Sequence, residues 1–214
     1  MDTKPPFPKA VAIFAGAYLL AFGGVAIAKA NGEFIFYLGV MLVLVAAVYA
    51  VHRRVGFSPL VLWLLALWGF GHMGGGTIPI PQSFADGGSG DPVLYSFRLA
   101  PWFPRYDQLI HVYGFCCATL ASGEGLWAAT RPARVGLGFA TAAALMGAGF
   151  GAINEVVEFI ATQTLPETNV GGYVNTGWDL VSNTVGALLG AVVVWKRGAR
   201  PGRADSPPAT DPTA

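Results

Sequence analysis

The stretch "VGLGFATAAALMGAGFGAINEVVEFIAT", residues 135–162, decides the fold, because it is apolar and long enough to cross a bilayer yet ends on two carboxylates. Crossing the hydrocarbon core takes about 20 residues of helix. Glu155 and Glu158 stand three residues apart near the end of the stretch, with Asn154 beside them. An acid costs about 2.5–3.5 kcal/mol at the centre of a membrane helix. The stretch therefore predicts a membrane helix with a neighbouring group that compensates for these acids.

The composition of the whole chain agrees with a membrane protein. Of its 214 residues, 54% are hydrophobic and only 12% are charged, whereas a soluble domain carries about 25% charged residues. The formal net charge of +1 gives no general basic field, so we expect no nucleic-acid partner. The adjacent Cys116 and Cys117 lie in an apolar segment and suit packing better than a disulfide or a metal site.

Five further apolar segments accompany the one at 135–162. They lie at about 9–28, 34–51, 58–75, 108–128 and 176–195. We predict an all-α polytopic bundle of six transmembrane helices, residues 1–197, and a disordered tail rich in Pro, Ala and Asp, residues 198–214. The first segment is expected to be retained, because its apolar core exceeds the 7–15 residues of a signal peptide, although "AKA" at 28–30 resembles a cleavage site.

The basic residues fix the predicted orientation. With both termini in the cytoplasm, the inner side holds Lys4, Lys9, Arg53, Arg54, Arg131, Arg134, Lys196, Arg197, Arg200 and Arg203, and the outer side holds Lys29, Arg98 and Arg105. This split follows the positive-inside rule. The long connection at about 76–106 then lies outside, and its aromatic second half is expected to rest on the membrane interface or to cap the bundle.

The polar residues of the predicted helices form three groupings at helical spacing. Asp107 and His111 are an i, i+4 pair, as are Asp179 and Asn183. Glu155 lies three residues before Glu158, and Asn154 lies four residues before it. Such spacings put side chains on one face, about one turn apart. Each grouping therefore presents its polar side chains in one direction.

The predicted topology brings these groupings to one depth. Glu155 follows Arg134 by twenty-one residues, which is about 32 Å of helix and about one hydrocarbon thickness. The helices at 108–128 and 176–195 enter from the outside, and the helix at 58–75 ends near His72. We therefore predict one polar pocket, open or nearly open to the external side.

Small residues share the faces of the polar ones. Gly186 and Gly190 continue the face of Asp179 and Asn183, Gly147 and Gly151 continue that of Asn154 and Glu158, and Gly114 and Ala118 continue that of His111. Small residues let membrane helices approach closely. The last two helices are therefore expected to pack with their polar residues facing each other, and the fourth helix forms the third wall.

A divalent metal ion is the leading interpretation of the pocket. Its ligands would be His111, Glu155, Glu158 and Asp179, a set suited to Zn²⁺, Mn²⁺, Fe or Mg²⁺. Asp107, Asn154, Asn183 and His72 would support the ligands or face a substrate. The ion would activate water or polarise a phosphoryl or acyl group, with Glu155 and Glu158 as candidate catalytic residues. The substrate would be a lipid or an envelope precursor in the outer leaflet.

Two other functions stay open at this stage. The acids and His111 could relay protons or cations in a coupled transporter, although they gather at one face of the membrane. They could also form a structural polar network without catalysis. On the opposite side Glu124 is expected to pair with Arg131 or Arg134. The sequence alone does not decide between an enzyme, a transporter and a structural role, nor does it give an oligomeric state.

"YDQLIH", "NEVVEF" and "GWDLVSNTVGALLG" resemble the pattern of the YjdF-like family of uncharacterised bacterial inner-membrane proteins, and more distantly VanZ-like proteins. The resemblance covers about 105–195 and implies a multi-pass protein of the bacterial inner membrane. The matching positions are Asp107, His111, Glu155, Glu158 and Asp179. The chain departs from the pattern before the last helix, where "NTGWD" replaces a Gly-Asp-x-Trp-Asp element. The resemblance implies no established activity.

Overall fold

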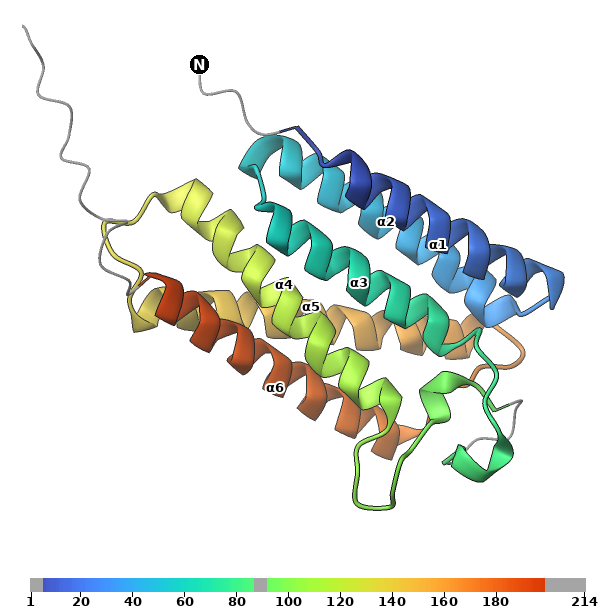
Figure 1. The fold of residues 1–214 in the computed structure, drawn as a ribbon. Helices are drawn as coiled ribbons and strands as arrows, with labels where there is room; N and C mark the ends of the chain where they lie inside the picture. Colours follow the sequence, from blue (N-terminus) through green and yellow to red (C-terminus); the bar gives the residue numbers. More distant parts are fainter. Residues whose placement is uncertain (1–5, 87–91, 199–214) are drawn as a thin grey trace, which may run out of the picture.

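A computed structural model describes residues 6–86 and 92–198, which form a bundle of long helices (Figure 1). These helices are α1 (Lys9–Ala28), α2 (Gly32–Val55), α3 (Pro59–Gly75), α4 (Tyr106–Thr130), α5 (Leu137–Thr164) and α6 (Tyr173–Gly198). Two short 3₁₀ helices, η1 (Gln82–Phe84) and η2 (Leu94–Ser96), lie in the connection between α3 and α4. Each predicted apolar segment therefore corresponds to a helix.

Four of these helices are long and apolar enough to cross a membrane: α1, α2, α5 and α6. Helix α3 is apolar but has 17 residues, because the helix ends at the glycines that follow His72. Helix α4 has 25 residues and is more polar, since it carries Asp107, His111 and Glu124. The protein thus has several helices suited to a membrane, whereas spanning by α3 and α4 stays a prediction.

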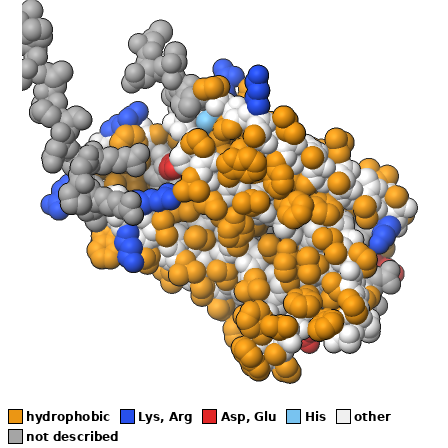
Figure 2. All heavy atoms as spheres, viewed as in Figure 1, with side chains coloured by type: hydrophobic (Ala, Val, Ile, Leu, Met, Phe, Trp, Pro, Cys, Tyr) orange, Lys and Arg blue, Asp and Glu red, His pale blue; other side chains and the backbone are white. Residues whose placement is uncertain are grey.

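The outer surface of the bundle fits a lipid environment. Hydrophobic side chains cover much of the visible face, and most Lys and Arg side chains on that face lie at one end (Figure 2). Leu20 in α1 is 80% exposed and Leu145 in α5 is 69% exposed. In water such side chains would favour burial by about 25 cal/mol per Å² of apolar surface, so contact with acyl chains accounts for their exposure.

Helices α4, α5 and α6 pack against one another, and α4 also packs on α3. Two glycines set the distance between α4 and α6. A Cβ on Gly186 would lie 2.2 Å from the carbonyl oxygen of Val112, and one on Gly190 would lie 2.8 Å from that of Cys116. On α5, a Cβ on Gly151 would lie 2.8 Å from Cβ of Asn183. The predicted role of small residues in this packing is therefore confirmed.

At the end of the bundle that carries most of the basic residues, Glu124 of α4 is hydrogen-bonded to the residue that precedes α3. Ser58 begins α3, and its hydroxyl accepts a hydrogen bond from the backbone N–H of Val61. Glu124 of α4 accepts bonds from the Ser58 N–H at 2.7 Å and from its hydroxyl at 2.6 Å. The predicted pairing of Glu124 with Arg131 or Arg134 is wrong, because the start of α3 supplies nearer donors. Arg131 stacks over the Trp127 ring instead.

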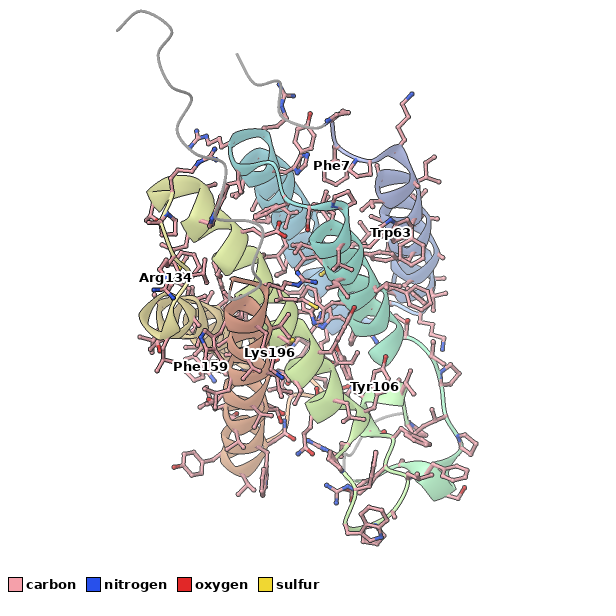
Figure 3. The ribbon with its side chains drawn as sticks, turned by 60° about the vertical axis from the view of Figure 1, so that its left-hand side comes forward. Phe7, Trp63, Tyr106, Arg134, Phe159 and Lys196 are labelled. Carbon is pink, nitrogen blue, oxygen red and sulfur yellow. The ribbon has the colours of Figure 1, made fainter. Side chains whose placement is uncertain are left out.

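The connection between α3 and α4 caps the opposite end of the bundle. Tyr106, the first residue of α4 (Figure 3), donates a hydrogen bond to the Gly71 carbonyl. Tyr95 in η2 lies over Gly75, and Arg98 forms a 2.7 Å ion pair with Asp86. The predicted capping of the bundle is observed, and contact of this connection with the membrane interface stays a prediction. Residues 87–91 of this connection and the predicted tail, apart from its first residue Gly198, lie outside the described residues.

Candidate functional site

His111 is the centre of a polar cluster in which α4, α5 and α6 meet near the capped end of the bundle. Its ring is 8% exposed. The Nδ1 atom lies 2.8 Å from Oδ1 of Asn183 in α6. The Nε2 atom lies 3.5 Å from Oδ1 of Asp107 and 3.7 Å from Oε1 of Glu158 in α5. One imidazole thus connects side chains from three helices.

Asn183 fixes the orientation of this imidazole. Its amide nitrogen donates to Oε1 of Glu155 at 2.8 Å and approaches the carbonyl oxygen of Gly151 at 3.4 Å. The amide oxygen is therefore left to accept, which places the proton of a neutral His111 on Nδ1. The lone pair on Nε2 then faces Asp107 and Glu158. This arrangement, in which the other ring nitrogen donates to a neighbour, is typical of metal-binding histidines.

Two carboxylate oxygens in the cluster are buried without a hydrogen-bond partner among the described residues. They are Oε2 of Glu155 and Oδ1 of Asp179. The other oxygen of Asp179 accepts a bond from Asn175, one turn earlier in α6. Asp179 has no exposed surface and Glu155 is 8% exposed. A buried polar atom without a partner costs about 1–3 kcal/mol, so each oxygen has capacity for a proton or a cation.

The cluster contains two sets of residues with the spacing of metal ligands. In each set, one ligand atom per residue lies within 4.8 Å of the others. The first set is Asp107, His111 and Asp179, and the second is His111, Glu155 and Glu158. The four residues predicted as metal ligands are divided between the two sets, which share His111: Asp179 belongs to the first set, with Asp107, and Glu155 and Glu158 belong to the second.

The remaining predicted site residues have different positions. Asn154 donates to Oε1 of Glu158 at 2.7 Å, one turn along α5. His72 lies outside both ligand sets: its ring stacks on Trp68, and its Nδ1 is hydrogen-bonded to the Tyr95 hydroxyl. Burial raises the pKa of Tyr95 well above its ordinary value, so the phenol keeps its proton.

The cluster is more enclosed than the predicted open pocket. Asp179 and Asn183 are fully buried, while the side chains of Asp107 and Glu158 keep 18% and 16% of their surface exposed. The close approach of α4 and α6 at Gly186 and Gly190 contributes to this cover. A ligand from outside would meet Asp107 and Glu158 first.

Two neighbours of the cluster and one buried acid of α2 were not predicted from the sequence. Asn175 lies four residues before Asp179 and could have been found by the same i, i+4 rule, had the helix been predicted to start earlier. Arg105 lies 3.7 Å from Asp107. Glu33 in α2 is buried and accepts bonds from the backbone and side chain of Asn169, at 2.9 and 3.2 Å. This last contact joins segments far apart in the sequence, so no local pattern indicates it.

Comparisons with known proteins place the chain in a membrane family. The model of the family described as "Predicted membrane protein (DUF2238)" matches residues 10–200. No curated protein and no solved structure matches the chain. The match supports the predicted membership in an uncharacterised membrane family, and it does not confirm the YjdF-like or VanZ-like names.

Proposed function

Because the chain belongs to the DUF2238 family of predicted membrane proteins, we propose that it is a multi-pass metalloprotein of the bacterial inner membrane. In this proposal all six helices span, both termini are cytoplasmic, and the His111 cluster lies at the outer face. The cluster binds a divalent metal ion through His111, Glu155, Glu158 and Asp179. The bound ion acts on a lipid or an envelope precursor in the outer leaflet.

The observation that carries the proposal is the pair of unpartnered buried oxygens in the cluster around His111. Oε2 of Glu155 and Oδ1 of Asp179 lack donors among the described residues, and Nε2 of His111 faces Asp107 and Glu158. Two unit charges 4 Å apart interact by about 4 kcal/mol at an effective dielectric constant of 20. A divalent cation attracts each carboxylate and so offsets their mutual repulsion. It would also bind the lone pair on Nε2 of a neutral His111.

The chemistry proposed for the site follows from its ligands and its position. Carboxylate and imidazole ligands suit Zn²⁺, Mn²⁺, Fe²⁺ or Mg²⁺. Such an ion lowers the pKa of a bound water and polarises a phosphoryl or acyl oxygen. The partly exposed edge at Asp107 and Glu158 supplies the side from which a substrate would approach. With the ion bound, Glu155 or Glu158 would accept a proton from an attacking water.

The first test measures the metal content of protein purified in detergent without chelators. The wild type is expected to hold metal in stoichiometric amount, and Glu158→Gln is expected to lose at least ten-fold in metal affinity, because a neutral amide replaces an anionic ligand. Glu167→Gln is the matched control, since Glu167 is an exposed carboxylate outside the cluster. Wild-type protein that holds no metal, even after incubation with each of the four ions, would contradict the proposal.

The two alternatives give different results in the same comparison. A proton- or cation-coupled transporter would show gradient-driven uptake in proteoliposomes, which Glu158→Gln would abolish. A structural network would instead lower the thermal unfolding midpoint of Glu158→Gln while neither protein holds metal. The proposed metal site instead requires stoichiometric metal in the wild type, and weaker metal binding by a Glu158→Gln protein that is still folded.

A further inference from the structure

Arg105 stands at the edge of the cluster with its guanidinium only weakly engaged. It precedes α4, and its backbone N–H donates to Oε1 of Gln108 at 3.0 Å, which fixes the first turn of the helix. Its Nη2 atom lies 3.7 Å from Oδ2 of Asp107, beyond the usual range of a hydrogen bond. By contrast, Arg98 in the same connection lies 2.7 Å from Asp86. The Arg105 guanidinium therefore retains donors for another group.

The surroundings of Arg105 are those expected of a residue at the depth of lipid headgroups. Trp102, three residues earlier, is 82% exposed, and exposed tryptophans are typical of the membrane–water interface. The Arg105 side chain is 19% exposed, and the adjoining Asp107 is 18% exposed. The guanidinium is thus partly exposed beside the carboxylate of Asp107.

We infer that Arg105 is the anion-binding residue of the proposed metal site and that the ligand of the site carries a phosphoryl group. The inference rests on the proposed function. A guanidinium binds two phosphoryl oxygens in a fork, and a divalent ion holds another oxygen of the same group. Asp107, adjacent to Arg105 and to His111 Nε2, brings the two binding groups to one edge of the site.

The charges of the cluster make this binding dependent on metal. Four carboxylates, Asp107, Glu155, Glu158 and Asp179, and the single cation Arg105 sum to −3 when His111 is neutral. Each divalent ion offsets two of these negative charges. With one ion bound the sum is −1, so a phosphoryl group is repelled less by the metal-bound cluster than by the metal-free one, and the ion supplies a local attraction.

The test measures binding of phosphate groups to protein loaded with Mn²⁺, using the paramagnetic relaxation of ³¹P by the bound ion. Inorganic phosphate and a short-chain phosphatidic acid in detergent are the two probes, compared among wild type, Arg105→Ala, Arg105→Lys and Lys29→Ala. Lys29 is the matched control, because it is an exposed cation in the connection between α1 and α2. The Mn²⁺ content of each variant is measured first.

Arg105→Ala is expected to keep its Mn²⁺ and to bind the phosphate probe at least ten-fold more weakly. Arg105→Lys should fall between it and the wild type, and Lys29→Ala should match the wild type. Tighter binding of phosphatidic acid than of inorganic phosphate identifies a lipid source, and equal binding identifies free phosphate. Unchanged binding by Mn²⁺-loaded Arg105→Ala, or no binding of either probe by the loaded wild type, overturns this inference alone. Wild type that holds neither Mn²⁺ nor any of the other three ions overturns the proposed function as well.

Discussion

At the scale of single residues, the cluster depends on Asn183 as much as on its charged members. This side chain contacts His111 Nδ1 and Glu155 Oε1 at once, both at 2.8 Å. It thereby sets which nitrogen of His111 carries the proton and which faces the acids. Removing a residue that orients a metal ligand in this way lowers the metal affinity by about 10–100-fold.

Asn183→Ala is therefore expected to weaken metal binding by about 10–100-fold, because the imidazole loses the acceptor that fixes its tautomer. The measurement is a titration of purified apoprotein with Mn²⁺ or Zn²⁺. Thr184→Ala is the control on the next position of α6, where the exposed hydroxyl donates to the Leu180 carbonyl. Equal metal affinities in the two variants would show that Asn183 does not orient the ligand.

At the scale of helices, glycine decides how closely α4 and α6 approach. Gly186 faces the backbone of Val112, whereas Gly177 on the same helix has no atom within 4 Å of its virtual Cβ. A methyl group on Gly186 would collide with the backbone of α4, which cannot shift aside as the end of a flexible side chain can. The same substitution therefore has opposite consequences at these two positions.

Gly186→Ala is expected to destabilise the protein by about 1–3 kcal/mol, the usual cost of forcing an extra methyl into a packed interface. Gly177→Ala should leave the stability unchanged or raise it slightly, because alanine favours a helix over glycine. The measurement is the thermal unfolding midpoint in detergent at one fixed scan rate, since unfolding of such proteins is often irreversible. A Gly186→Ala midpoint equal to that of Gly177→Ala would contradict the close approach.

At the scale of the whole molecule, the membrane topology depends on whether α3 and α4 cross the membrane. Lys29, Gln82 and Glu167 lie outside in a six-span protein, while Arg53 and Arg134 lie inside. If α3 and α4 did not cross, only the side of Gln82 would change. Gln82 is exposed in η1, so a label attached there reports the topology with little disturbance of the bundle.

Single cysteines at these five positions are expected to react with a membrane-impermeant maleimide as follows. Lys29→Cys, Gln82→Cys and Glu167→Cys should label in intact cells, and Arg53→Cys and Arg134→Cys only after lysis. The wild type controls for Cys116 and Cys117, which lie within α4 as half-buried and buried thiols. A Gln82→Cys protein that labels only after lysis would reduce the protein to four spans.

Much of this protein is determined by its sequence alone. Long apolar runs predict the helices because a helix satisfies its own backbone hydrogen bonds in lipid. Spacings of three and four residues predict which polar side chains share a face, and the small residues predict which faces meet. For that reason Asp107, His111, Glu155, Glu158 and Asp179 could be placed in one cluster before the fold was known.

The tertiary structure decided what depends on segments distant in the sequence. It placed the amide of Asn183 between His111 and Glu155, and it left an oxygen of Asp179 buried without a donor among the described residues. It also brought Glu124 within hydrogen-bonding distance of the start of α3, and Glu33 within hydrogen-bonding distance of the α5–α6 connection. Hydrogen bonds act over about 3 Å, and only the packing of the helices brings such partners within that range.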